Sequence, residues 1–298
     1  MLKKKRRRVA RRRAAWPRAT LLSVVILLLA ALIHVLLPPA TPDVYGGLPQ
    51  PQSLPIRLSS HVLRNEGFSL AYSEWWRTPL WVAYRLSGLP EGASPPRPDH
   101  FTSDRRTLWP VDEADYSHSG YDRGHMAPNH LIASLYGREA QRETFRMSNI
   151  VPQRPRLNQL LWQRIEALEA DGVAGRFPGT YVLVGPVFDA ASRRLDSGVA
   201  VPSAFYRIWL RVNGDAVPKA LAFLVPQTVC GDEPLARYLV SVDTLEAVTG
   251  LDFFAALDDA LEAQFESQPS SDFWSLTTYA NRPARYANSF RGGRCTRE

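Results

Sequence analysis

Short apolar runs recur along most of the chain and predict the strands of a sheet. Residues 68–72 alternate between apolar and polar side chains, as a half-buried strand does. Further strands are predicted where β-branched and aromatic residues gather, at 80–86, 180–187, 204–212 and 220–225.

Helices are predicted at 131–145, 157–170 and 242–265. In the second of these, apolar residues recur at the three- and four-residue steps of an amphipathic helix. Pro155 suits the start of this helix, and Asp171-Gly172 is expected to end it. Together these elements predict an α+β domain with a central, mainly antiparallel sheet flanked by helices.

One apolar run is longer than any strand needs. Residues 20–37 carry no charge over eighteen positions, close to the length of a membrane-spanning helix, and the tail 1–19 carries ten Lys or Arg and no acid. A positive flank before an apolar run predicts a single-pass signal-anchor with the N-terminus in the cytoplasm and the rest periplasmic or extracellular. The tail would then lie against anionic lipid of the inner or plasma membrane.

A cleaved signal peptide is the competing interpretation of this segment, although signal-peptide apolar cores are usually shorter, about 7 to 15 residues. Residues 38–56 follow, and their prolines and Gly46-Gly47 predict a semi-rigid linker. The remaining residues, 57–298, are enough for one domain with a single core.

The first stretch with chemical character is YDRGHMAPN at 121–129. Gly124 would let the backbone bring Arg123 and His125 close to a ligand without a Cβ in the way. A neutral imidazole can accept a proton near neutral pH, and a guanidinium can pair with a phosphate. The spacing of His118, His125 and His130 matches no compact zinc pattern.

The second such stretch is MSNIVPQ at 147–153 with the helix that follows it. On that helix Asn158, Trp162 and Glu166 stand four residues apart and are expected to share one face. An amide oxygen and a carboxylate on one face can hold a largely hydrated Mg²⁺, which needs few protein ligands. Taken alone, Asn158 could equally cap the helix and Glu166 could pair with Arg164.

These stretches together resemble the DNA/RNA non-specific endonucleases, the ββα-metal nucleases with a D-R-G-H motif that include the endonuclease G type. The resemblance extends through PLWVAY at 79–84, VPSAFY at 201–206 and the segment 242–254, and so spans about 57–265. It implies the ββα-metal nuclease fold and a hydrolase that cuts both DNA and RNA.

The resemblance also implies roles for individual residues. His125 resembles the general base, Asn158 the direct ligand of Mg²⁺, and Glu166 a carboxylate that orients the waters of the metal. Arg123 resembles a residue that supports the phosphate, and Mn²⁺ could replace Mg²⁺. Asn149 and Gln153 fall on supporting polar positions, and Arg97 on an arginine that stabilises developing charge.

The implied reaction is in-line attack on phosphorus by a water that His125 deprotonates, leaving 5′-phosphate ends. A different class of function stays open, namely a catalytically silent nucleic-acid receptor for uptake at the cell envelope. A third class is a structural envelope protein in which Arg123 and His125 belong to a salt-bridge network. A homodimer and an inhibitor protein are further partners that the sequence leaves open.

Charge excludes a broadly basic nucleic-acid coat. The chain has a net charge of +7, but without the ten basic residues of its tail it holds 26 basic against 29 acidic residues. Attraction to a polyanion must then come from a local patch. The candidates are Arg97, Arg105, Arg106, Arg123, Arg146, Arg154 and Arg156.

The chain contains two cysteines, Cys230 and Cys295, too few for a zinc ribbon. In an oxidising compartment they could pair and hold the C-terminal segment to the domain. Two separate thiols are the alternative, since pairing needs Cα atoms within about 7 Å.

Overall fold

The computed structural model describes residues 44–88, 95–189, 191–214, 216–268, 282–285, 287–292 and 295. The segments expected as a basic tail and a signal-anchor helix lie outside this part of the chain. No helix within these ranges has both the length and the apolar character needed to cross a bilayer.

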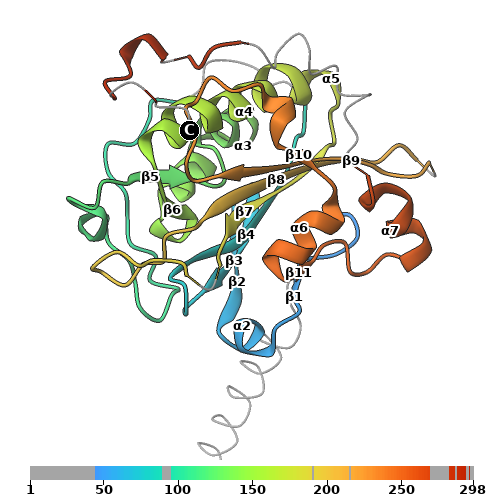
Figure 1. The fold of residues 1–298 in the computed structure, drawn as a ribbon, viewed down its shortest axis with the longest axis horizontal. Coiled ribbons are helices and arrows are strands. Elements are labelled where there is room, and N and C mark those ends of the chain that lie inside the picture. The colour runs from blue at the N-terminus through green and yellow to red at the C-terminus, as the bar shows by residue number, and fades with distance from the viewer. Residues whose placement is uncertain are drawn as a thin grey trace, which may run out of the picture. The chain divides into compact units, whose positions relative to one another are not determined.

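A seven-stranded sheet forms the centre of the domain (Figure 1). Its strand order is β10-β9-β8-β7-β4-β3-β2, and every neighbouring pair is antiparallel. All five strands predicted from the sequence are confirmed and occupy its middle. The strands are β2 (Ser60–Asn65), β3 (Phe68–Ser73), β4 (Thr78–Arg85), β7 (Tyr181–Val187), β8 (Ala204–Arg211), β9 (Lys219–Pro226) and β10 (Leu239–Val240).

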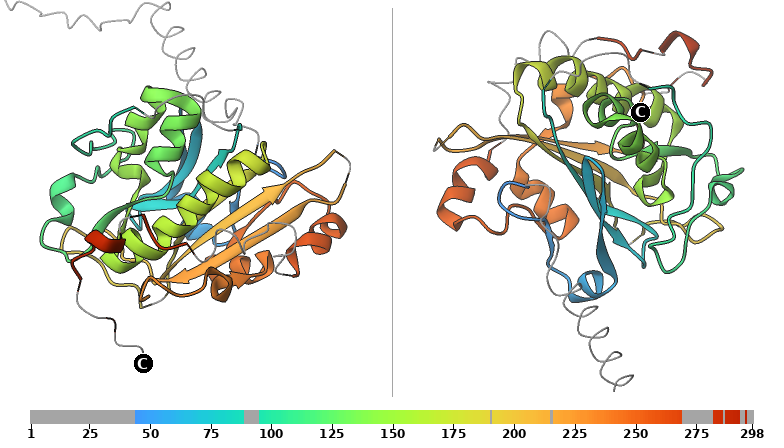
Figure 2. Two further views of the ribbon diagram at one scale, coloured as in Figure 1. Left: turned by 90° about the horizontal axis from the view of Figure 1, so that it is seen from above. Right: turned by 180° about the vertical axis from the view of Figure 1, so that it is seen from behind.

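Both faces of the sheet are covered, which explains why most strand positions are buried. One face packs against α3 (Asn129–Thr144) and the helix that begins at Leu157. The other face packs against α6 (Val242–Thr249) and α7 (Asp259–Glu266) (Figure 2). Alternation along the strands sends Leu70 and Tyr72 to the first core and Ala71 to the second.

The single helix predicted over 242–265 is wrong, because two helices occupy this stretch. Gly250 adopts a left-handed conformation (φ 65°) and ends α6, and Asp258 caps the start of α7. Between them, β11 (Leu251–Asp252) pairs with β1 (Gln50–Pro51). Buried Phe253 and Phe254 give this interruption a core of its own.

The pairing with β11 shows that part of the expected linker 38–56 is folded. Val44, Tyr45, Leu48 and Ile56 pack against the second core, and α2 (Leu54–Leu58) leads into β2. Apolar residues placed between the prolines explain this packing, since a spacer held in solvent would leave them exposed. The folded unit therefore includes residues ahead of 57.

Candidate active site

A separate two-stranded sheet presents the first conspicuous motif. β5 (Asp122–His125) pairs antiparallel with β6 (Ile150–Gln153), so that His125 lies opposite Ile150 and Asp122 opposite Gln153. The chain between them folds into α3 and the short helix η2 (Met147–Asn149). Pairing thus joins the two sequence motifs at one edge of the domain.

Gly124 is required because Gln153 lies over it. A Cβ at residue 124 would stand 2.1 Å from Oε1 and 2.4 Å from Cδ of Gln153. Gln153 is fully buried, and neither polar atom of its side chain has a hydrogen-bond partner among the residues described. Gln153 therefore packs beneath the motif and does not line the cavity described below.

Asn149 also has a supporting place. Its Oδ1 accepts a hydrogen bond from the N–H of Ala127 (2.9 Å), and its Nδ2 donates to the carbonyls of Ala127 (3.1 Å) and Thr144 (2.9 Å). Both ends of the buried amide are used by backbone groups. Asn149 therefore fixes the turn between His125 and α3.

The helix that carries the remaining candidates is longer than predicted. It runs without a break through η3 (Leu157–Trp162), α4 (Gln163–Leu168), η4 (Glu169–Val173) and α5 (Ala174–Arg176), so Asp171-Gly172 does not end it. The first and third parts are π-helical, a wider turn that often marks functional sites. Trp162 does not share the exposed face as expected but is buried in the core.

Asp122 fixes the orientation of Asn158. Its Oδ2 accepts hydrogen bonds from Nδ2 of Asn158 (2.9 Å) and Nε2 of Gln159 (2.8 Å). Because a carboxylate can only accept, the NH₂ group of Asn158 must face it. The amide oxygen of Asn158 is left without a donor among the described residues. Asp122 belongs to the D-R-G-H motif, yet sequence reasoning assigned it no role.

His125 is held between aromatic rings. Its ring centroid lies 5.4 Å from that of Phe101 and 4.8 Å from that of Phe145. Burial, with a smaller contribution from Arg97, lowers the pKa of His125 to about 3. The ring is therefore neutral at neutral pH, and its buried Nε2 has no partner in the described part of the chain.

Each of the two rings that flank His125 also carries one arginine. The guanidinium of Arg97 lies 5.0 Å from the ring centroid of Phe145, and that of Arg123 lies 5.1 Å from that of Phe101. Arg123 also approaches Glu113 (Nη2 to Oε1, 3.4 Å). Both cations keep donors that can face an anion, because the stacking contacts use only the planar faces of the guanidinium groups.

Glu166 lies above a buried charge network. Its Oε1 is 3.9 Å from Nη2 of Arg207, whose Nη1 is 3.2 Å from Oε2 of Glu169. Glu169 also accepts hydrogen bonds from Tyr84 (2.6 Å) and Trp209. Burial raises the pKa of Glu166 to about 7, and Arg207 opposes this rise.

A cavity of about 720 Å³ brings most of the predicted site together. Five of the residues singled out from the sequence line it, namely Arg97, Arg123, His125, Asn158 and Glu166. Sequence reasoning gave no role to the other lining residues, among them Asn129, whose buried Oδ1 has no partner in the described ranges, and Arg285. Asn129 is the last residue of the stretch 121–129, so the motif was a signal for it, whereas Arg285 had none.

The clusters of His, Cys and acidic residues that could hold a metal lie elsewhere in the described chain. One contains Cys230, Asp232 and Glu233, and the other Asp243, Glu246 and Glu266. Neither contributes to the cavity. A metal in the cavity would therefore depend on an amide oxygen, the single carboxylate of Glu166, water and substrate.

The comparisons with known proteins agree with this geometry. A family model described as DNA/RNA non-specific endonuclease matches residues 51–260. The mitochondrial nuclease EXOG of Xenopus laevis is 36% identical over 207 residues, a match that covers 64% of this chain and 57% of that protein. The nuclease of Serratia marcescens is 30% identical over 200 residues, covering 63% and 73%.

A solved structure supports the same conclusion. EndoG, in a crystal structure of the EndoG/EndoGI complex, is similar with a TM-score of 0.59 and 25% sequence identity, over 66% of this chain and 87% of that chain. Both have a central antiparallel sheet flanked by helices. Because the family model covers more than half of the sequence and includes both motifs of the cavity, the chain belongs to the DNA/RNA non-specific endonuclease family.

Proposed function

We propose that the chain is a Mg²⁺-dependent endonuclease that hydrolyses phosphodiester bonds of DNA and RNA and leaves 5′-phosphate ends. One observation carries the proposal: the neutral ring of His125 and the free amide oxygen of Asn158 line the same cavity. A base and a hard oxygen ligand side by side are what hydrolysis of a phosphodiester needs. Binding alone needs neither.

His125 would act as the general base. Burial keeps its ring unprotonated before substrate arrives, with a pKa of about 3. A phosphate group that enters the cavity brings negative charge, which favours the imidazolium form and raises this pKa. Proton transfer from the attacking water to His125 then becomes favourable in the complex with substrate.

The residues of the cavity fit a hard divalent ion. Asp122 holds the NH₂ group of Asn158, which lines the cavity, and the amide oxygen has no competing donor among the described residues. Mg²⁺ prefers oxygen ligands and keeps most of its waters, so one amide oxygen and a nearby carboxylate such as Glu166 are sufficient. When bound, the ion would stabilise the charge that grows on phosphate oxygens.

The remaining side chains would bind and orient the substrate. Arg97 and Arg123 can donate hydrogen bonds to a phosphate, and their aromatic supports restrict their motion. Glu166 lines the cavity, and in its ionised form it can accept hydrogen bonds from ordered water. None of these groups reads a base edge or the 2′-hydroxyl, which supports cutting of both DNA and RNA.

The test is cleavage of supercoiled plasmid and of RNA by the full chain, with Mg²⁺ and with EDTA, beside His125→Ala and Asn158→Ala. We expect metal-dependent cutting of both polymers that either substitution reduces by at least about a hundredfold. Wild-type protein that binds DNA but cuts with neither Mg²⁺ nor Mn²⁺ would instead establish the nucleic-acid receptor.

We also propose that residues 20–37 anchor the enzyme in the inner or plasma membrane with the nuclease domain outside the cytoplasm. The support is the uncharged run next to a tail of ten basic residues. An inhibitor protein is a further proposed partner, supported by the complex in which the structural relative EndoG was solved with EndoGI.

A further inference from the structure

We propose that the C-terminal segment forms one wall of the catalytic cavity and that Arg285 binds a phosphate of the nucleic-acid strand beside the scissile one. The inference deepens the proposed nuclease function. Arg285 and Ser289 line the cavity together with Arg97, His125, Asn158 and Glu166. Both residues lie beyond 260, where the family match ends.

The segment is anchored to the helix that carries Asn158 and Glu166. The N–H of Arg285 donates to Oε1 of Gln163 (2.7 Å), and its Nη2 pairs with Oδ1 of Asp171 (2.7 Å). Nε of Arg164 donates to the carbonyl of Arg282 (3.0 Å). The position of Arg285 is therefore fixed relative to the proposed metal ligand.

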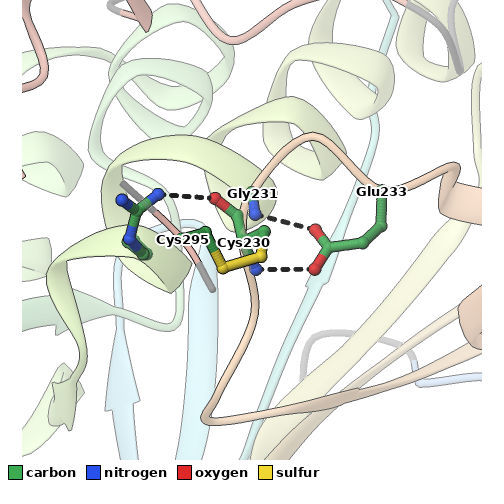
Figure 3. The surroundings of a disulfide bond; sticks show 5 residues. Cys230, Gly231, Glu233 and Cys295 are labelled. Atoms are coloured by element: carbon green, nitrogen blue, oxygen red, sulfur yellow. Dashed lines mark hydrogen bonds between the residues drawn. A yellow bond between two sulfur atoms is a disulfide. The ribbon is translucent and has the colours of Figure 1, made fainter. Parts of the chain in front are cut away.

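A covalent link fixes the far end of the segment. Cys230 and Cys295 form a disulfide with Cα atoms 5.4 Å apart (Figure 3). The carboxylate of Glu233 accepts hydrogen bonds from the N–H groups of Cys230 (2.6 Å) and Gly231 (2.7 Å), which holds the loop on the domain side. The guanidinium of Arg156 lies 5.2 Å from the ring centroid of Phe290 and supports the middle of the segment.

The charge and exposure of Arg285 suit an anion. Its side chain is 42% exposed, and its ion pair with Asp171 involves only Nη2. Since a guanidinium has five N–H donors, others remain for a phosphate.

Arg97, Arg123 and Arg285 come from three separate segments of the chain around one cavity. A single phosphate next to His125 and Asn158 would be served by Arg97 and Arg123. Arg285 stands on the helix side, at Gln163 and Asp171, where the next phosphate along a bound strand would lie. A polymer would therefore use Arg285, and a small phosphodiester would not.

The test compares the wild type with Arg285→Ala on two substrates, plasmid DNA and the small phosphodiester bis(p-nitrophenyl) phosphate. We expect KM for DNA to rise about tenfold or more, the size of a charge-assisted hydrogen bond, with kcat and turnover of the small substrate unchanged. Arg285→Lys should fall between the two. Unchanged KM for DNA would overturn the inference, and so would an equal loss of kcat on both substrates.

The control is Arg57→Ala, which removes the same charge from exposed α2, at the opposite end of the view from α4 (Figure 1). A matching rise in KM for Arg57→Ala would also overturn the inference, because it would assign the effect to overall charge. The melting temperature of each variant shows whether it is folded.

DNA binding by fluorescence anisotropy separates this inference from the proposed function. In a His125→Ala background, Arg285→Ala should weaken binding about tenfold and reduce the salt dependence by about one phosphate contact. Cys295→Ser should also weaken DNA binding, because the disulfide holds the segment that carries Arg285. In a chain that already carries Arg285→Ala, adding Cys295→Ser should have a much smaller effect. If the wild type does not cut but Arg285→Ala still weakens DNA binding, the subsite is retained and the nuclease function is rejected. If the wild type cuts but Arg285→Ala leaves DNA binding unchanged, the subsite alone is rejected.

Discussion

The two asparagines that the motifs supply differ in the hydrogen-bond partners of their side-chain amides. Asn149 uses both ends of its amide on the backbone of residues 127 and 144, is fully buried and does not line the cavity. Asn158 lines the cavity and uses only its nitrogen, on Asp122, so its oxygen has no donor among the described residues. The same residue type therefore supports the fold at one position and can bind a metal at the other.

Replacement of Asp122 tests this arrangement. In Asp122→Ala the amide of Asn158 is free to rotate, and we expect the Mg²⁺ concentration for half-maximal activity to rise about 10- to 100-fold. Asp122→Asn is the matched control, since an amide oxygen can still accept the bond from Asn158. Identical Mg²⁺ titrations for Asp122→Ala and the wild type would contradict the role assigned to Asp122.

The contact between Gly124 and Gln153 predicts a pair of coupled substitutions. Gly124→Ala places a methyl group 2.1 Å from Oε1 of Gln153, and we expect a loss of about 1–3 kcal/mol in the free energy of unfolding from overpacking. In the Gln153→Ala background the same change should cost much less, because the blocking atoms are gone. Urea unfolding of the four proteins measures the coupling, and additive losses would contradict it.

Glu166 gives a pH dependence of stability. Its pKa rises from 4.5 to about 7 on folding, mainly because it is buried, so the unfolded chain ionises it at lower pH than the folded chain does. The free energy of unfolding therefore falls as the pH rises from 4.5 to 7, because ionisation of Glu166 is less favourable in the folded chain. The melting temperature of Glu166→Gln minus that of the wild type should therefore be larger at pH 8 than at pH 5. The same difference between the two proteins at both pH values would refute this.

Among the elements, the helix from Leu157 to Arg176 determines the geometry of the cavity. The carboxylate of Glu169 holds this helix on the sheet, because it accepts hydrogen bonds from Tyr84 on β4 and from Arg207 and Trp209 on β8. The π-helical turn places the carboxylate of Glu169 in the core while Glu166, three residues earlier, faces the cavity. Buried Arg207 then lies between the two acids.

Removal of Glu169 should be severe, because Arg207 is fully buried and would lose its closest acidic partner. We expect Glu169→Ala to lower the free energy of unfolding by about 3–5 kcal/mol, the usual cost of an uncompensated buried charge. Tyr84→Phe, which removes one hydrogen bond from the same carboxylate, should cost about 1.5–3 kcal/mol. A smaller loss for Glu169→Ala than for Tyr84→Phe would contradict the network.

For the whole molecule, the sequence predicts an anchor that the structure does not describe. We expect the full chain to sediment with membranes and to resist alkaline extraction, because eighteen uncharged residues at 20–37 can span the hydrocarbon layer. A chain lacking residues 1–37 should stay in the supernatant and keep its nuclease activity. An N-terminus that mass spectrometry places after residue 37 in the native protein would establish a cleaved signal peptide instead.

The sequence alone predicted the elements whose signals are local. Strand alternation at 68–72 and the helical period after Leu157 depend on neighbours within a few residues, so both survive in the structure. The helix predicted over 242–265 failed because a left-handed Gly250 and the pairing of β11 with β1 interrupt an apolar pattern that looks continuous. That pairing joins segments about two hundred residues apart, and no local pattern records it.

For the site, the sequence by itself determined the residue types, namely a histidine, an asparagine and arginines in recognisable motifs. Tertiary structure alone decided how they meet. Asp122 orients Asn158 from 36 residues away, and Arg285 pairs with Asp171 across 114 residues. Periodicity and motif spacing are properties of neighbouring residues, whereas the orientation of an amide and the wall of a cavity depend on atoms that only folding brings within hydrogen-bonding distance.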